Sequence, residues 1–242
     1  DRFPENAVAR TGQAEVLRDL GRFSEALAAY DAAIDRFPEN AVARNGRANL
    51  LGSVGELDQV VEMLSDVASS PKRRSDWVAV HILGMAYLQV GDLDKADEML
   101  SLGLTSCPFL DQRSYFSSAY AVLSLTMDKA PEAENQLSEL ANAKNIPQAM
   151  KRNVILLHAH ALASCGRVER AREALNNPQI VDFATERQKR LARSIDDRFG
   201  LEGISNNSTE ENGILDEKIL SLEVQLIGAP NFGVSRPKSF AV

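Results

Sequence analysis

The chain has 242 residues, of which 44% are apolar and 25% charged, with a formal net charge of −7 and a pI of about 5.1. This composition is ordinary for a folded domain. The acidity argues against general nucleic-acid binding and against attraction to anionic membranes, which both require a basic face. No apolar run approaches the roughly 20 residues of a membrane-spanning helix, so we expect a soluble protein, with the cytoplasm slightly favoured. Cys107 and Cys165 lie far apart and suggest neither a disulfide framework nor a zinc site.

An internal repeat is the strongest feature of the sequence. The ten residues DRFPENAVAR at 1–10 recur unchanged at 35–44, which gives a period of 34 residues. Ten identities in ten positions are not explained by composition. A period of 34 is typical of a helix–turn–helix unit, whose amphipathic helices bury their apolar faces only by stacking on neighbouring units.

Residues 80–108 resemble one complete tetratricopeptide motif. Leu83, Gly84 and Tyr87 follow Val80 at the spacing of that family, although the family usually has Trp at the place of Val80. The second helix of the family motif carries an A-x-x-x-F element. It recurs along this chain, with an aliphatic residue or Tyr at its second place, as Ala26/Tyr30, Val60/Leu64, Ala96/Leu100, Ala133/Leu137 and Ala171/Leu175. The resemblance covers about residues 1–178 and implies an all-α, right-handed superhelical solenoid of about five repeats.

The predicted helices come in pairs joined by short turns. We expect them at 7–20 and 23–36, 41–54 and 57–69, 75–90 and 93–105, 111–126 and 130–143, and 148–164 and 167–176. Residues 179–200 are expected to form one capping helix, with Ile180, Phe183, Leu191 and Ile195 on its apolar side. Residues 1–6 have the same sequence as residues 35–40, which follow the second helix of the first unit, and so they resemble the end of a preceding repeat. We therefore expect further repeats upstream and an uncapped, apolar N-terminal end.

Residues 201–242 are predicted to lie outside the repeats as a linker and tail. Residues 219–227 alternate apolar and polar side chains, which favours a strand, but Leu215, Ile219, Leu222 and Leu226 also form a helical stripe. The segment 214–228 is also a candidate for folding back onto the array as a pseudo-ligand. A truncation after Gly200 is expected to leave the repeats folded.

The resemblance also implies where a partner binds, because the first helices of tetratricopeptide repeats line a concave groove. Mapped onto this sequence, the groove side chains are Thr11, Glu15, Arg18, Asn45, Asn49, Ser53, His81, Met85, Gln89, Leu156 and His160. Asn45 and Asn49 share one helix face, and their amides can hydrogen-bond a peptide backbone in both directions. The alternative is an ordinary solvated helix face.

Several other functions are disfavoured by the sequence. It contains no G-x-S-x-G, P-loop or H-E-x-x-H motif, so we expect neither an enzyme nor a bound cofactor. His158 and His160 point to nearly opposite sides of a helix, which argues against a shared metal. Of the positions that form a carboxylate clamp in one tetratricopeptide subtype, only Asn49 matches, so capture of a chaperone tail is not expected.

These observations predict a protein-interaction scaffold or adaptor that holds a peptide or a partner helix in the groove. Two alternatives remain open at this stage. The array could be the regulatory or substrate-recruiting part of a larger enzyme, or it could assemble with itself through its uncapped N-terminal end or its tail.

Overall fold

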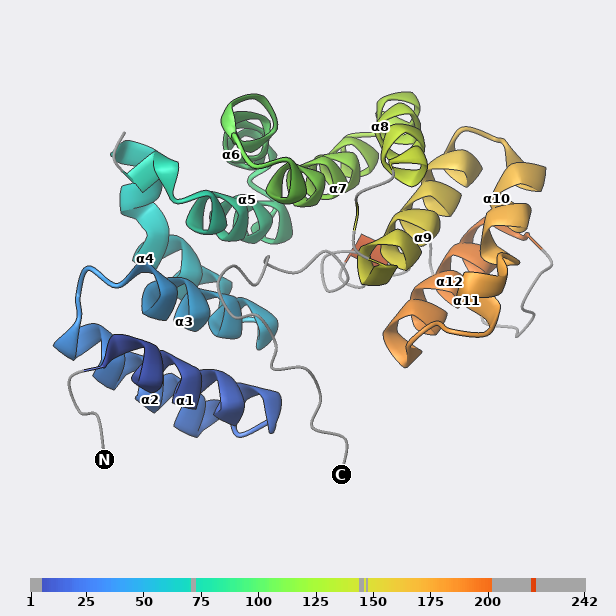
Figure 1. Ribbon diagram of the computed structural model, residues 1–242. Coiled ribbons are helices and arrows are strands. Elements are labelled where there is room, and N and C mark those ends of the chain that lie inside the picture. The colour runs from blue at the N-terminus through green and yellow to red at the C-terminus, as the bar shows by residue number, and fades with distance from the viewer. Residues whose placement is uncertain (1–5, 71–72, 144–145, 147, 202–218, 221–242) are drawn as a thin grey trace.

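The computed structural model describes residues 6–70, 73–143, 146, 148–201 and 219–220, and these residues form helices and short connections without any strand (Figure 1). The α-helices are α1 (Ala7–Asp19), α2 (Phe23–Arg36), α3 (Ala41–Ser53), α4 (Leu57–Ser69), α5 (Trp77–Val90), α6 (Leu93–Ser106), α7 (Leu110–Thr126), α8 (Ala130–Asn142), α9 (Gln148–Ser164), α10 (Val168–Leu175), α11 (Pro178–Val181) and α12 (Glu186–Phe199). A single 3₁₀ turn, Arg73–Ser75, precedes α5.

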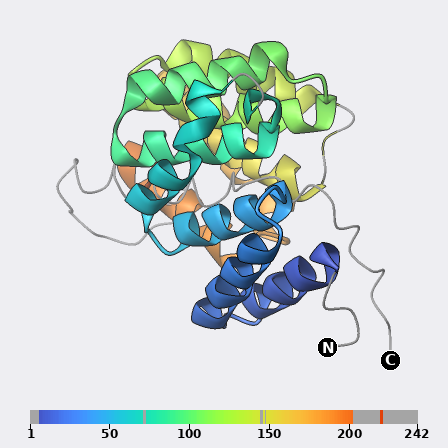
Figure 2. The ribbon, with the colours of Figure 1, turned by 90° about the vertical axis from the view of Figure 1, so that its left-hand side faces the viewer.

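Consecutive helices pair into five repeats, from repeat 1 (α1 and α2) to repeat 5 (α9 and α10), and α12 follows repeat 5 against α9. The repeats follow an arc, as Figures 1 and 2 show. In Figure 1, α3, α5, α7 and α9 face the inside of this arc, whereas α4, α6, α8 and α10 form its outside. The predicted all-α solenoid of five helix–turn–helix repeats is confirmed.

The repeated sequence gives two helices the same start. Asn6 caps α1, and its side-chain oxygen accepts hydrogen bonds from the backbone N–H groups of Val8 at 2.9 Å and Ala9 at 3.2 Å. Asn40, at the same place in the next repeat, caps α3 and accepts from the N–H of Ala43 at 3.0 Å. Asparagine is among the best N-cap residues because it satisfies N–H groups that the helix leaves unpaired.

The turn inside each repeat requires a left-handed backbone. Four repeats place a glycine there, with φ between 72° and 88° at Gly21, Gly55, Gly91 and Gly166. Repeat 4 places Asp128 at this point, with φ 57°. Aspartate tolerates this conformation better than most residues with a β-carbon, which explains how repeat 4 closes its turn without glycine.

Close helix crossings depend on a large side chain that lies over a glycine of its neighbour. The ring of Tyr30 (α2) lies over Gly46 (α3), where a β-carbon would come within 2.5 Å of the ring. Leu100 (α6) lies over Gly84 (α5) in the same way, with 2.7 Å to such a β-carbon. At Gly103 (α6) a β-carbon would collide with the ring of Phe116 (α7). The contacts of Gly46 and Gly103 join one repeat to the next.

The core is divided along the array into three clusters. A small N-terminal cluster consists of Ala14, Ala26, Tyr30 and Leu50 from α1, α2 and α3. The largest cluster extends from α3 to α9, and a C-terminal cluster connects α9 and α10 with Leu191 and Ile195 of α12. The first two clusters contain side chains from adjacent repeats, whereas the C-terminal cluster joins repeat 5 to α11 and α12, so each repeat is stabilised by a neighbouring element.

The predicted continuous helix over 179–199 is wrong. The structure divides it into α11 and α12, because Thr185 begins a new helix with a capping box. The Thr185 hydroxyl accepts from the backbone N–H of Gln188 at 3.3 Å, and the Gln188 side-chain oxygen accepts from the N–H of Thr185 at 2.8 Å. Phe183 lies between the two helices and is 68% exposed, so it is not part of the apolar face.

Most of the predicted linker and tail, and with it the predicted strand over 219–227, lies outside the described residues. Ile219 and Leu220 are described and are helical. Ile219 and Leu201 are both buried in the C-terminal cluster, and the Leu201 carbonyl accepts from Arg172 at 2.6 Å. A truncation after Gly200 therefore removes two core side chains, and we expect it to destabilise α9–α12 instead of leaving the repeats unaffected.

Candidate functional site: the inner face of the array

The inner face of the arc is formed by the first helices of the repeats, where the sequence predicts the groove (Figure 1). The predicted groove side chains differ strongly in how much surface they expose. Those that are exposed or half-buried are Glu15, Arg18, Asn49, Ser53, Gln89 and His160. Those that are buried are Thr11, Asn45, His81, Met85 and Leu156. Only the first group has side-chain surface that a partner can contact.

The accessible group lies mainly on α1, α3 and the end of α5. Arg18 is held along α1 by hydrogen bonds from its guanidinium to Asp19 Oδ1 at 3.0 and 3.2 Å. The Ser53 hydroxyl donates to the Leu50 carbonyl at 2.7 Å, and the Gln89 amide donates to the Met85 carbonyl at 3.4 Å. These side chains are partly ordered by their own helices and still expose polar atoms.

Thr11 and Met85, both predicted to contact a partner, are turned into the structure. The Thr11 hydroxyl donates to the backbone carbonyls of Ala7 at 3.0 Å and Val8 at 3.1 Å, within its own helix. Met85 belongs to the large core cluster, and Leu156 to the C-terminal cluster. These three side chains therefore support the helices that carry the face.

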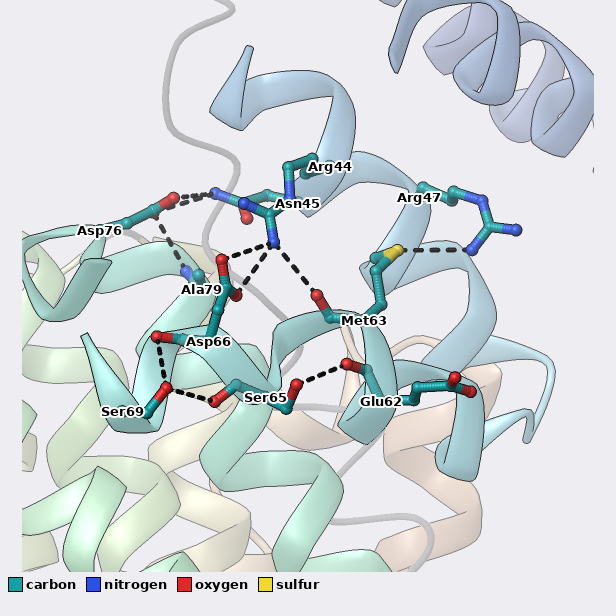
Figure 3. A network of polar contacts seen from close by, with 10 residues as sticks. All are labelled: Arg44, Asn45, Arg47, Glu62, Met63, Ser65, Asp66, Ser69, Asp76 and Ala79. Carbon is teal, nitrogen blue, oxygen red and sulfur yellow. Dashed lines mark hydrogen bonds and ion pairs between the residues drawn. The ribbon is translucent and has the colours of Figure 1, made fainter. Parts of the chain in front are cut away.

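Asn45 connects two repeats. Its amide nitrogen donates to both carboxylate oxygens of Asp76, at 3.0 and 3.1 Å, and Asp76 caps α5 by accepting from the N–H of Ala79 at 3.2 Å (Figure 3). The amide oxygen of Asn45 is buried without a hydrogen-bond partner. Because the donor side is occupied and the acceptor is enclosed, Asn45 orients the start of α5 and has no free group for a peptide.

A second set of polar contacts beside Asn45 fixes α3 to its two neighbours, α4 in the same repeat and α2 in the preceding one. Arg44 donates to the Met63 carbonyl at 3.1 Å and pairs with Asp66 at 3.0 Å, so that α3 is fixed to α4 (Figure 3). Arg47 pairs with Asp31 of α2 at 2.6 Å. The Arg44 side chain is 14% exposed and that of Asp66 is 43% exposed, so the pair lies at the edge of the interface between α3 and α4. Sequence reasoning missed both pairs, because their partners are remote in the sequence.

His81 lies in the core between α5 and α7. Its ring packs edge-on against Phe116 at a centroid distance of 5.2 Å and against Tyr115 at 6.2 Å, and neither ring nitrogen makes a hydrogen bond. Burial lowers the pKa of His81 to about 4, because the charged imidazolium loses its hydration; the backbone of Tyr115 offsets part of this effect. His81 is thus a neutral core residue and offers no surface to a partner.

The two histidines of α9 contact different helices. His158 Nε2 lies 3.5 Å from Glu134 Oε1 of α8, and burial lowers the pKa of His158 while Glu134 opposes the shift. The same carboxylate pairs with Arg167 at 3.1 Å and lies 3.8 Å from Arg170. The ring of His160 packs 5.7 Å from that of Phe199 on α12. His158 therefore belongs to a charged cluster between repeats 4 and 5, which the sequence did not predict.

The remaining candidate features do not combine into a site. Within the described residues no three His, Cys, Asp or Glu side chains are grouped so that they could hold a metal ion. No helix in the described part of the chain is long and apolar enough to cross a membrane. Cys107 is buried and Cys165 is half-buried. Arg74, which precedes α5, donates to the Ala68 carbonyl at 2.6 Å and pairs with Glu98 at 2.9 Å.

Comparisons with known proteins agree with the geometry. A family model described as tetratricopeptide repeat matches residues 8–40, which cover α1 and α2. Among solved structures, a tetratricopeptide repeat protein from Parabacteroides merdae ATCC 43184 is similar to this chain, with a TM-score of 0.61 and 16% sequence identity. The likeness covers 90% of this chain and 84% of the other. No curated protein matches the sequence.

Paired helices stacked along an arc define a helical-repeat solenoid. The 34-residue period, the glycine turns and the family match at residues 8–40 specify the kind of repeat: residues 8–40 form a tetratricopeptide repeat, and the array as a whole has the fold of a tetratricopeptide repeat solenoid.

The two asparagines of α3 provide a direct test of which side chains are structural. Asn45→Ala removes the link to Asp76, so we expect the free energy of unfolding to fall by about 1–2 kcal/mol, since hydrogen bonds to a charged acceptor are lost. Asn49→Ala is the matched control on the same helix and should change stability by no more than about 0.5 kcal/mol. Urea denaturation of both variants measures the difference; equal effects would contradict the structural role of Asn45.

The buried imidazole of His81 predicts acid sensitivity. The folded protein does not take up a proton at His81 until about pH 4, whereas the unfolded chain does so near pH 6.5. The contribution of neutral His81 to stability is therefore complete above pH 6.5 and is lost as the pH falls toward 4, by about 3 kcal/mol. His81→Leu should make unfolding less pH-dependent over this range. Denaturation of both proteins from pH 7.5 to pH 4 measures this, and parallel curves would show that His81 is not the cause.

Proposed function

We propose that this protein is a scaffold or adaptor that binds a peptide or a partner helix on its inner face, through α1, α3 and the C-terminal end of α5. Tetratricopeptide repeats generally mediate protein–protein interactions, and the fold of this chain is typically a non-catalytic scaffold. The observation that supports the proposed location is the distribution of accessible polar side chains. Glu15, Arg18, Asn49, Ser53 and Gln89 keep accessible surface. The other predicted positions on α1, α3 and α5 are buried, namely Thr11, Asn45, His81 and Met85.

The chemistry of this surface suits a peptide backbone. The Asn49 and Gln89 amides each offer both a donor and an acceptor, so that they can pair with a backbone N–H and a backbone C=O. Arg18 is ion-paired with Asp19 at 3.0 Å, so α1 offers a guanidinium and a carboxylate side by side to polar groups of the partner. Together these groups provide directional hydrogen bonds on α3 and α5 and an ion pair on α1.

The same surface is supported by a rigid framework. His81 and Met85 are the buried side chains of α5 that anchor it in the core, and Asn45 fixes the start of α5 to α3 through Asp76. A face held in place by buried neighbours loses little conformational entropy when a partner binds, and this lowers the cost of association. The buried residues of the predicted groove therefore contribute to binding indirectly, by holding the surface in shape.

The proposal predicts a site-dependent loss of affinity. A variant with Glu15, Arg18, Asn49 and Gln89 changed to Ala should bind a captured partner at least about tenfold more weakly, which corresponds to about 1.4 kcal/mol. The matched control changes the exposed outer-side residues Asp58, Glu62, Asn135 and Glu139 to Ala and should bind normally. Circular dichroism verifies that both variants fold, and titration of each with the purified partner gives the affinities.

A photo-crosslinking amino acid identifies the contact face independently. Placed at Ser53 on the inner face, it should crosslink the partner, and placed at Glu139 on α8 it should not. Equal affinity of the two alanine variants for the partner, together with crosslinking from Glu139 but not from Ser53, would move the site to the outer side and contradict the proposal.

A further inference from the structure

Two residues that follow α12 in the sequence pack against repeat 5. Ile219 is 1% exposed and belongs to the C-terminal cluster, together with side chains of α9 and α12. Leu220, the next residue, packs against the largest cluster, to which α9 also contributes. Both residues are helical, and Figure 1 shows them as a short red ribbon beside α9. We call this pair the C-terminal turn; it lies where the two clusters meet on α9.

The predicted groove positions of repeat 5 are in contact with the chain's own C-terminal elements. Leu156 is fully buried in the cluster that contains Ile219. His160, one turn further along α9, packs its ring against that of Phe199 on α12. By contrast, Asn49 on α3 keeps accessible surface. The inner side of repeat 5 is therefore covered in part by α12 and the C-terminal turn.

α12 is attached to repeat 5 by direct polar contacts. The Gln188 amide donates to Asn153 Oδ1 of α9 at 2.6 Å, and Gln188 is 4% exposed. After α12, the backbone N–H of Leu201 donates to the Asp196 carbonyl at 3.3 Å, and the Leu201 carbonyl accepts from Arg172 of α10 at 2.6 Å. These hydrogen bonds make α12 and Leu201 a fixed wall beside α9.

The C-terminal turn is attached differently. Its described contacts are the apolar packing of Ile219 and Leu220, and residues 202–218 separate it in the sequence from Leu201. Residues 203–213 of this connection are rich in Gly, Asn, Ser and Glu, a composition typical of linkers. Two aliphatic side chains at the end of such a connection resemble a tethered peptide ligand, which is held at its site mainly by a high local concentration.

We propose that α9, α12 and Leu201 form a binding site for a helix that presents two adjacent large aliphatic residues, and that the C-terminal turn occupies this site as an intramolecular ligand. A partner's helix of the same chemistry competes with the turn, so the turn determines how much of the inner side of repeat 5 is open to a partner. This inference concerns repeat 5 and does not depend on the proposed binding of a partner through α1, α3 and α5.

The test uses the full chain and a fluorescent peptide with the sequence of residues 212–230. In the protein, residues 205–211 are replaced by the recognition sequence of a site-specific protease, so that cleavage leaves every described residue in place. Before cleavage the tethered turn has an effective concentration of about 1 mM at its site and should exclude the peptide. After cleavage the peptide should bind at least about tenfold more tightly, as measured by fluorescence anisotropy.

Further measurements distinguish a ligand from a fixed part of the core. The unfolding midpoint of the cleaved protein should rise with added peptide, because a ligand that binds only the folded state stabilises it. A peptide with Ile219 and Leu220 both changed to Asp should neither bind nor stabilise. In the uncleaved chain, Ile219→Ala weakens the turn and should raise the affinity for the peptide. The matched control Val181→Ala, at a valine of α11 that is 59% exposed, should not.

Two results would overturn the proposal. The first is a cleaved protein that stays folded by circular dichroism and binds no peptide, because the turn would then be a fixed part of the core. The second is equal binding of the peptide before and after cleavage, because the turn would then not occupy the peptide's site. Should cleavage itself unfold α9–α12, the uncleaved Ile219→Ala variant decides: an affinity equal to that of the original chain would contradict the proposal.

Discussion

The structure depends on one kind of contact, in which a large side chain of one helix lies over a glycine of the next. Tyr30 over Gly46 joins repeat 1 to repeat 2, and Phe116 over Gly103 joins repeat 3 to repeat 4. Each contact requires two residues of opposite size on different repeats, so it sets the distance between helices and their register at once. An isolated repeat would lose these two contacts between repeats, although the contact of Leu100 with Gly84 lies inside repeat 3 and would remain.

The sequence predicted the fold well because the repeat is a local pattern. The unchanged decapeptide, the glycines of the turns and the spacing of small and large residues each act within one or two helices, and the helix bounds agree with the structure within about two residues. The error over 179–199 has a local cause as well. Thr185 and Gln188 form a capping box that starts a new helix, and its signature was present in the sequence.

The candidate site was predicted less completely, because the position of a residue in the motif gives its direction but not its neighbours. The spacing places Asn45 and Asn49 on the same face of α3, yet Asn45 is hydrogen-bonded to Asp76, a residue 31 positions away. His81 occupies a motif position that faces the inner side, but Tyr115 and Phe116 of the following repeat enclose it. Such partners belong to other repeats, and only the three-dimensional structure reveals them.

The most direct test of this account is the stability of Gly103→Ala, measured by urea denaturation of the full chain. Helix propensity alone predicts that alanine at this position stabilises α6 by about 1 kcal/mol. Our account predicts the opposite sign, a loss of about 2 kcal/mol or more, because the new methyl group meets the ring of Phe116 and forces repeats 3 and 4 apart. Equal or higher stability would contradict the claim that these large-on-small contacts hold the array together.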